Sequence, residues 1–327
     1  MRMPWRDRHG RFLPIKAVVL ALAFMPGLVN VMWWLTGDLG GRPLTEMIHA
    51  TGLWSVRFLL IALAITPFAR MFDWPRLLLV RRMVGITALA YAVSHLALYI
   101  ADQKFKLLFV ASEIVLRFYL TIGFVALLGL IALGVTSTDN AVRRLGRRWK
   151  QLHRLAYPIA VLGILHYFIQ TKANVSQPVF VAGLFVWLML WRPLPDGWKR
   201  QVATYPVLAV VTGLATAGLE FAWYGVATNI DAWRVLLANQ SLDFGLRPAH
   251  WVFVVGLAVA ALVPLRRFVM RRKGTPGSGG IVRQMGNPAG NSKVNVPVTP
   301  PVNPPTNSPG NPAINPLGRS KSISGAT

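Results

Sequence analysis

Apolar runs of about 20 residues recur along this chain, which is the length of helix that crosses a hydrocarbon core of about 30 Å. Hydrophobic residues make up 54% of the sequence and charged residues only 14%. Helices of soluble proteins have one polar face, whereas segments such as 121–135 are apolar on every side. The sequence therefore predicts an all-α polytopic membrane protein.

We predict eight membrane spans from these runs. They cover residues 15–35, 49–67, 82–101, 118–135, 153–171, 178–192, 204–226 and 249–265. A basic N-terminal segment, 1–14, precedes the first span.

Lysine and arginine are concentrated in one set of alternate connections between the spans. This set comprises the N-terminal segment and the stretches 70–82, 143–154, 192–200 and 266–273. By the positive-inside rule, both termini are expected in the cytoplasm. Because the basic residues are divided among these connections, the net charge of +24 does not indicate nucleic-acid binding.

The composition changes abruptly after residue 273. The stretch 274–327 is rich in Pro, Asn, Gly and Ser and has no aromatic residue. Such a segment buries too little apolar surface to offset the entropy cost of ordering it. We predict that 274–327 is a disordered cytoplasmic tail.

The chain contains no cysteine, which restricts the cofactors that it can bind. Disulfides, iron–sulfur clusters, thiolate-ligated haem and covalent C-x-x-C-H haem attachment are all excluded. Histidine is the remaining strong ligand for a transition metal.

Two histidines are predicted to lie at the same depth on different spans. His95 follows Arg82 by thirteen residues, and His166 follows His153, which borders a basic stretch, by the same number. At 1.5 Å per residue, each lies about 20 Å from the cytoplasmic face. His95 and His166 are therefore expected to be level with each other, in the outer half of the membrane.

A level pair of imidazoles on two helices is the arrangement that clamps a b-type haem. Gly85, Ala88 and Ala92 share a helix face with His95; they would leave room for a porphyrin or merely allow close helix packing. The alternative is a hydrogen-bonded histidine pair without metal. Ionisable groups inside a membrane are usually functional, which favours the haem.

His153 is harder to assign. On an ideal helix it lies about 140° from the face of His166, although Pro158 can change the helix phase between them. It could be the protein ligand of a second haem, an alternative ligand, a hydrogen-bonding group for a cofactor at the inner face, or an interfacial histidine without a cofactor.

Arg57 and His49 are candidate contacts for the haem edge. Arg57 is an intramembrane cation near the level of the histidine pair, and a haem propionate would neutralise it. His49, at the outer end of the same span, could add a hydrogen bond. The alternative is that both side chains reach to the outer interface.

Four segments resemble the MsrQ (YedZ) family of the ferric-reductase-like transmembrane group. They are "ITPFAR" at 65–70, "RRMVGITALAYAVSHLALY" at 81–99, "RFYLTIG" at 117–123 and "WKQLHRLAYPIAVLGILHYF" at 149–168. The resemblance implies a six-helix haem-binding bundle at 15–200, with His95, His153 and His166 linked to haem. Residues 201–273 would then be two additional transmembrane helices, which depart from the family pattern.

The resemblance also implies a function. Members of this family are haem b membrane subunits, with one haem or two and an associated FMN, in the bacterial inner membrane. They pass electrons to a periplasmic molybdopterin-containing methionine sulfoxide reductase that repairs oxidised periplasmic proteins. The expected donor is a cytoplasmic flavin reductase using NAD(P)H, or the quinone pool.

Two other functions remain open at this point. One is a ferric or quinone reductase-like cytochrome b that serves a different partner. The other is a haem-free transporter or scaffold, with the histidines as proton relays. In the favoured interpretation, the chain is an electron-transfer subunit and not the catalytic subunit.

Overall fold

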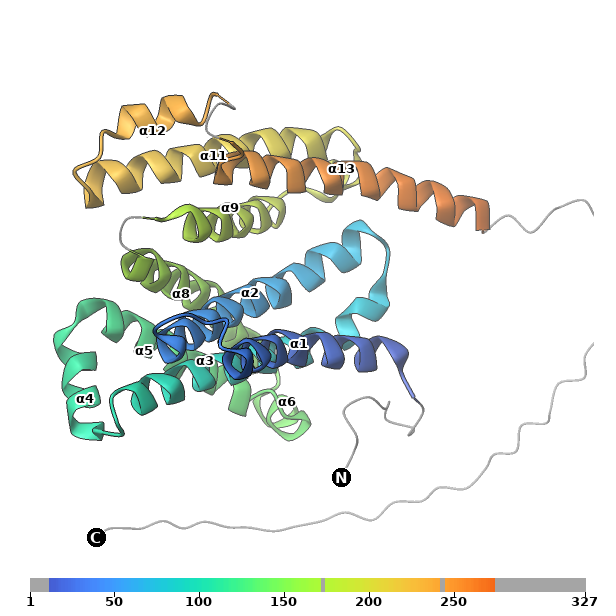
Figure 1. The fold of residues 1–327 in the computed structure, drawn as a ribbon. Coiled ribbons are helices and arrows are strands. Elements are labelled where there is room, and N and C mark those ends of the chain that lie inside the picture. Colours follow the sequence, from blue (N-terminus) through green and yellow to red (C-terminus); the bar gives the residue numbers. More distant parts are fainter. Residues whose placement is uncertain (1–11, 172–173, 242–244, 274–327) are drawn as a thin grey trace, which may run out of the picture. The chain divides into compact units, whose positions relative to one another are not determined.

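The computed structural model describes residues 12–171, 174–241 and 245–273, so the predicted tail lies outside the described residues. The described helices belong to one compact unit (Figure 1). The long helices are α1 (Pro14–Thr36), α2 (Pro43–Met71), α3 (Arg81–Asp102), α5 (Phe118–Val135), α8 (Ala156–Thr171), α9 (Ser176–Trp191), α11 (Thr204–Ala227) and α13 (Pro248–Lys273). The short ones are η1 (Pro75–Leu79), α4 (Leu107–Leu116), α6 (Asp139–Leu145), α7 (Arg147–Leu152), η2 (His153–Leu155), α10 (Asp196–Arg200) and α12 (Ala232–Ala238).

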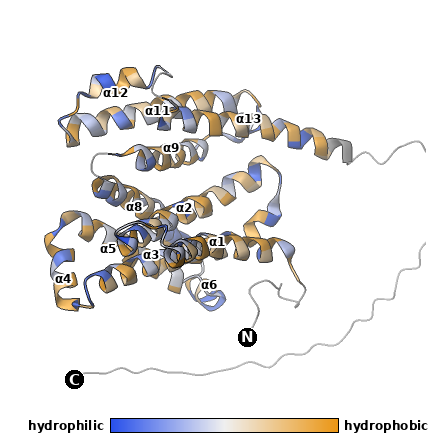
Figure 2. Ribbon diagram, in the orientation of Figure 1, coloured by the Kyte–Doolittle hydropathy of each residue, from blue (hydrophilic) through white to orange (hydrophobic). Residues whose placement is uncertain are grey.

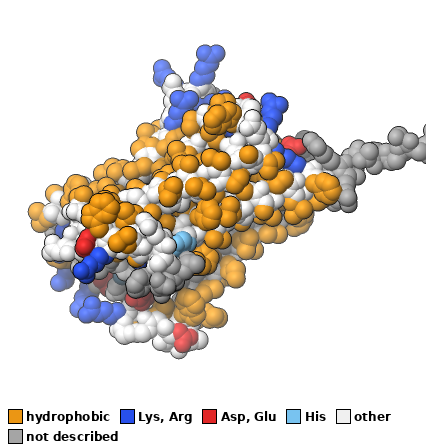
Figure 3. Space-filling view, turned by 90° about the horizontal axis from the view of Figure 1, so that it is seen from above, with side chains coloured by type: hydrophobic (Ala, Val, Ile, Leu, Met, Phe, Trp, Pro, Cys, Tyr) orange, Lys and Arg blue, Asp and Glu red, His pale blue; other side chains and the backbone are white. Residues whose placement is uncertain are grey.

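The surface of these helices is suited to lipid. Among the residues that the structure describes, seven candidate spans are long and apolar enough to cross a membrane, and the chain is a multi-pass membrane protein. Apolar residues run along the long helices, and hydrophilic residues gather at helix ends and in α6 (Figure 2). Apolar side chains cover most of the face seen in Figure 3, with Lys and Arg near its edges. A soluble monomer rarely exposes so continuous an apolar surface.

The sixth predicted span differs from a full-length crossing. The segment predicted at 178–192 forms α9, whose 16 residues are fewer than those of any of the seven candidate spans, since α7, η2 and α8 together form a candidate of 25 residues, Arg147–Thr171. It packs against α2, α8, α11 and α13, and half of its residues are buried. A helix enclosed by protein does not need to match the thickness of the hydrocarbon layer.

The fifth predicted span is not one continuous helix. A 3-10 turn, η2, separates α7 from α8, and His153 is its first residue. Pro158 has no backbone N–H, so it cannot hydrogen-bond the carbonyl four residues before it, and the regular helix resumes at Ala156. This turn supplies the change of phase between His153 and His166 that the sequence left undefined.

A proline near the end of α2 is compensated by an arginine at the end of α9. Pro67 cannot donate a hydrogen bond to the carbonyl of Leu63, which would otherwise be unsatisfied. Arg192, at the end of α9, donates to that carbonyl through Nη2 at 2.8 Å. Its Nε also donates to the Tyr157 hydroxyl at 3.2 Å, so Arg192 joins α2, α8 and α9.

A tyrosine from α3 is inserted into the backbone of α1. The Tyr91 hydroxyl accepts from the N–H of Gly27 at 2.8 Å and donates to the carbonyl of Ala23 at 2.9 Å. These two groups would bond to each other in an undisturbed helix, and such an insertion is a known cause of helix bending. Tyr91 thereby fixes α1 against α3.

The two additional helices, α11 and α13, pack closely on each other and on α9. A Cβ at Gly256 of α13 would lie 2.6 Å from the Cβ of Ala209 in α11. A Cβ at Gly183 of α9 would lie 2.3 Å from Oγ1 of Thr216 and 2.6 Å from a methyl of Val252. Small residues allow this approach, as is common between membrane helices.

A buried carboxylate ties the connection between α11 and α13 to the bundle. Glu220 in α11 is 1% exposed and accepts from Arg247 Nη2 at 2.6 Å and from Asn239 Nδ2 at 2.8 Å. Asn239 ends α12, and Arg247 directly precedes α13. The polar connection is therefore held by charge-assisted hydrogen bonds.

Replacing Glu220 with Ala should lower the free energy of unfolding by about 3 kcal/mol. The change leaves Arg247 without its partner, and the loss falls at the low end for buried pairs because the Arg247 side chain is 22% exposed. Thermal unfolding in detergent measures the effect. Arg234→Ala, which removes an exposed pair with Asp231, is the control and should cost less than about 1 kcal/mol. Equal losses in the two variants would contradict the role of Glu220.

Candidate functional site

Helices α2, α3, α5 and α8 enclose a cavity of about 690 Å³. Apolar side chains line most of it, and polar groups gather where α3 ends and α5 begins, which we call the outer end. The predicted residues His95 and His166 both line the cavity, and so does His49. The volume is within the range of sites for small molecules and cofactors.

Each imidazole of the pair is oriented by a backbone carbonyl. Nδ1 of His95 lies 2.8 Å from the carbonyl oxygen of Ile48, and Nδ1 of His166 lies 2.7 Å from that of Tyr119. A carbonyl can only accept, so each Nδ1 carries the proton and donates it. Nε2 of both neutral rings then keeps a lone pair, the state in which histidine binds a metal.

The separation of the two rings fits a metal held between them. Their centroids are 6.3 Å apart, and their planes are nearly perpendicular, at 82°. Imidazole nitrogens bind transition metals at about 2 Å, so a shared metal would place the two centroids about 6 Å apart. The structure therefore brings His95 and His166 together across two helices, and their role as metal ligands stays a prediction.

Glycines make room for both rings. A Cβ at Gly52 of α2 would lie 2.9 Å from Nδ1 of His95, and a Cβ at Gly123 of α5 would lie 2.8 Å from Nδ1 of His166. Any larger residue would therefore displace the ring or its hydrogen bond. In contrast, Gly85, which shares a helix face with His95, has open space around it.

A partly buried cation lies at the edge of the cavity. Nη2 of Arg57 donates to Oε1 of Gln177 at 3.3 Å, and the guanidinium lies 4.9 Å from the ring centroid of Trp54. Gln177 and Tyr167 line the cavity. Arg57 is thus linked to the site through Gln177, a residue that the sequence did not single out.

His153 lies elsewhere. Its ring stacks on Trp149 at 3.9 Å between centroids, its Nδ1 is 3.2 Å from the Trp149 carbonyl, and its Nε2 is 3.4 Å from Oγ of Ser137. It does not line the cavity of the other two histidines. The structure therefore brings together His95, His166 and His49, with Arg57 nearby, and leaves His153 apart.

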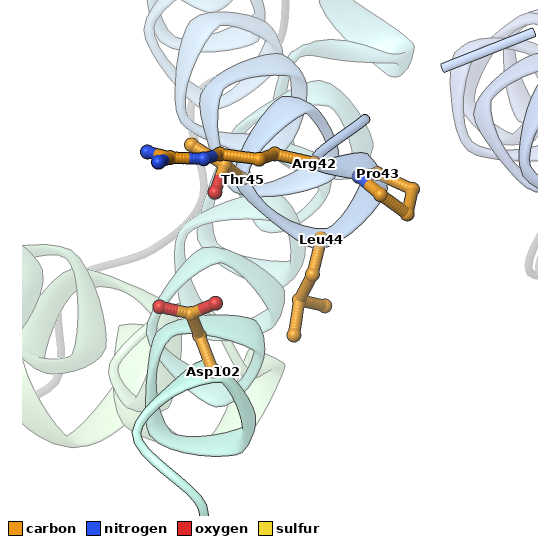
Figure 4. Close-up of a pocket in the computed structure, with 5 residues that line it drawn as sticks. All are labelled: Arg42, Pro43, Leu44, Thr45 and Asp102. Carbon is orange, nitrogen blue, oxygen red and sulfur yellow. The ribbon is translucent and has the colours of Figure 1, made fainter. Parts of the chain in front are cut away.

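A second, more open hollow of about 310 Å³ lies at the outer end (Figure 4). Arg42, Pro43, Leu44 and Thr45 at the start of α2 line it, together with Asp102 at the end of α3, whose carboxylate points toward α2. None of these residues was predicted as a ligand, and we assign it no cofactor.

The carbonyl partners and the glycines are the parts of the site that sequence reasoning missed. Gly123 occurs in one of the four segments that carry the family resemblance and Gly52 does not, and the spacing of neither gives a reason to pair it with a histidine of another helix. Ile48 and Tyr119 orient the histidines through backbone carbonyls, which have no signature in a sequence. The ring of Tyr119 also stacks against that of His166, with 6.2 Å between the centroids, and this contact was not predicted either.

Comparison with known proteins agrees with this geometry. The family model "Ferric reductase like transmembrane component" matches residues 51–164, which include His95 and end just before His166. No solved structure matches the chain.

Three relatives named "Protein-methionine-sulfoxide reductase heme-binding subunit MsrQ" align with the chain. The Rhodospirillum rubrum protein is 41% identical over 203 residues, which are 62% of this chain and 95% of the relative. The Caulobacter vibrioides protein is 43% identical over 181 residues, 54% of this chain and 86% of the relative. The Xanthomonas oryzae pv. oryzae protein is 41% identical over 196 residues, 58% and 88%.

More than a third of this chain lies outside each of these alignments, whereas the relatives are matched over most of their length. The sequence identity of these matches and their coverage of the relatives together show which family the chain belongs to. The chain belongs to the MsrQ family of ferric-reductase-like membrane proteins.

Proposed function

We propose that His95 and His166 hold a b-type haem in the cavity between α2, α3, α5 and α8, and that the chain is the electron-transfer membrane subunit of a methionine sulfoxide reductase system. One observation carries the haem assignment: two imidazoles on different helices present Nε2 to one cavity, each with Nδ1 held by a carbonyl. The names of the relatives, which describe a heme-binding subunit, support it.

A haem held by His95 and His166 would supply reversible one-electron transfer and would leave no coordination position for a substrate. The residues of this chain set its environment. The carbonyls of Ile48 and Tyr119 fix the orientation of the ligands, and hydrogen bonds of this kind make an imidazole a stronger donor. The mostly apolar walls would limit the access of water to the haem, and such burial tunes a reduction potential.

Arg57 and His49 are proposed to bind the polar edge of the haem. Arg57 is hydrogen-bonded to a neutral amide, and the pair lies beside the cavity, so a propionate would supply the missing negative charge. His49 lines the cavity near its outer end and would add a hydrogen bond. Such charge-assisted contacts are stronger than neutral hydrogen bonds.

Electrons are proposed to cross a bacterial inner membrane from the cytoplasm to the periplasm. The basic connections support a cytoplasmic position for both termini and would attract an acidic flavin reductase or a flavin phosphate; the quinone pool is the other proposed donor. The acceptor is a periplasmic molybdopterin-containing methionine sulfoxide reductase that repairs oxidised proteins. His153 is proposed as a ligand of a second haem or as a contact for FMN near the cytoplasmic face.

His95→Ala or His166→Ala should reduce the bound haem by more than about tenfold. Loss of a residue that merely orients a ligand costs about 10–100-fold in metal affinity, and loss of the ligand should cost at least as much. The visible spectrum of the purified, dithionite-reduced protein measures the haem. His250→Ala is the control, because His250 lies in α13, away from the four helices of the cavity. Normal haem content in both ligand variants would remove the assignment.

Gly52→Ala and Gly123→Ala should weaken haem binding by about 10–100-fold, because each new methyl would displace the ring whose Nδ1–carbonyl bond orients it. Haem titration of the purified protein measures the affinity. Gly85→Ala is the matched control. Its methyl meets open space within a helix, so it should leave the affinity unchanged and be neutral or slightly stabilising. Equal haem affinities of the three variants would contradict the contacts between these two glycine positions and the imidazole rings.

Reoxidation of the reduced protein separates this function from that of a ferric or quinone reductase. The dithionite-reduced protein should be reoxidised rapidly by the periplasmic reductase subunit together with a methionine sulfoxide substrate. Stopped-flow absorbance measures the rate. Reoxidation by ferric citrate or by a soluble quinone, without that subunit, should be much slower. Faster reoxidation by either of them would favour the ferric or quinone reductase function.

A further inference from the structure

Helix α4 is apolar and too short to cross a membrane. Its ten residues, Leu107–Leu116, extend about 15 Å, and Glu113 is its only charged residue. Figure 1 shows α4 running across the end of the bundle, between the end of α3 and the start of α5. An apolar helix of this length is typical of a segment that lies in a membrane interface.

One face of α4 is held by the protein. Val110 is 4% exposed, and Ile114 lines the histidine cavity. The Ile114 carbonyl accepts from Oγ1 of Thr121 in α5 at 2.6 Å. At the end of α4, Arg117 forms an ion pair with Glu113. The helix therefore covers part of the outer end of the cavity.

The opposite face of α4 is exposed and carries no charge. Leu108 is 89% exposed, Val115 77% and Leu116 78%. At 100° per residue these three positions fall on one broad arc, which also contains Ser112. The hydroxyl of Ser112 donates to the Phe109 carbonyl at 2.8 Å, so the one polar side chain on this arc is already satisfied.

Basic residues flank the apolar arc at both ends. Lys104 and Lys106 precede α4, and Arg117 follows it. Hydrogen bonding to Tyr119 and the negative charge of Glu113 raise the pKa of Arg117 above its ordinary value. Lys104 and Phe105 both have positive φ, 53° and 59°, which costs energy for residues other than glycine. This turn redirects the chain from α3 into α4.

We propose that α4 is an interfacial helix whose exposed face lies among the lipid acyl chains of the outer leaflet, with Lys104, Lys106 and Arg117 at the level of the lipid phosphates. A face that binds water would carry polar groups, and this arc has none that is free. Aliphatic residues with basic residues at the ends are the pattern of a helix in the boundary between headgroups and acyl chains. The lipid would thus hold α4 over the cavity, whether or not a haem is bound.

Site-directed labelling tests the position of α4, because the chain has no cysteine of its own. Leu108→Cys and Val115→Cys would each carry a nitroxide in the full-length protein, reconstituted in phosphatidylethanolamine–phosphatidylglycerol vesicles. Leu128→Cys, on the exposed side of α5, is the control for lipid, and Asp38→Cys, in the connection between α1 and α2, is the control for water. Collision rates with oxygen and with a water-soluble nickel complex measure the environment.

The labels at 108 and 115 should resemble the label at 128. At these positions the ratio of oxygen accessibility to nickel accessibility should be several-fold higher than at position 38. Their depth should be shallower than that of 128. Nickel accessibility equal to that of 38 would overturn the proposal. If this accessibility then fell on addition of the periplasmic reductase subunit, the arc would be a protein-docking surface and not a lipid contact. Both labelled positions are highly exposed, so neither substitution removes a packing contact.

Discussion

Because the interior of a membrane offers no water, the polar groups of the backbone must be satisfied within the protein. Several contacts of this chain follow from that constraint. Arg192 takes the carbonyl that Pro67 leaves free, and the Tyr91 hydroxyl bridges two backbone groups of α1. The two histidines of the cavity obey the same rule, since each gives its Nδ1 proton to a carbonyl of a neighbouring helix. The hydrogen bonds that satisfy these rings also prepare them as ligands.

Close approach between helices makes those bonds possible. The imidazole of His95 fits against α2 only because Gly52 has no side chain, and His166 depends on Gly123 in the same way. The two imidazoles are therefore positioned by the crossings of α2 with α3 and of α5 with α8. A site built on packed helices is held more rigidly than one built on loops, which suits a cofactor whose ligands must not move during electron transfer.

The sequence was sufficient to predict the fold class, most of the spans and the level of the histidine pair. Counting residues from the basic ends of two spans placed His95 and His166 together, because the helical rise is constant. Other features depend on tertiary packing and could not be read in this way. The short length of α9 became understandable only from the helices around it, and α4 was overlooked because ten apolar residues match neither a span nor a polar loop. Pro158 explains the 3-10 turn at His153. The sequence does not predict the angle by which this turn rotates His153 relative to His166 about the helix axis.

The enclosure of α9 has a consequence for how the protein responds to its bilayer. Helices in contact with lipid adjust to a thicker or thinner membrane by tilting or by deforming it. α9 packs against α2, α8, α11 and α13, so these neighbours would transmit much of any such adjustment to it. Its first turn carries Gln177, the partner of Arg57 at the cavity edge. α11 and α13 distinguish this chain from its shorter relatives. They would thus make one wall of the cavity less sensitive to variations in lipid composition.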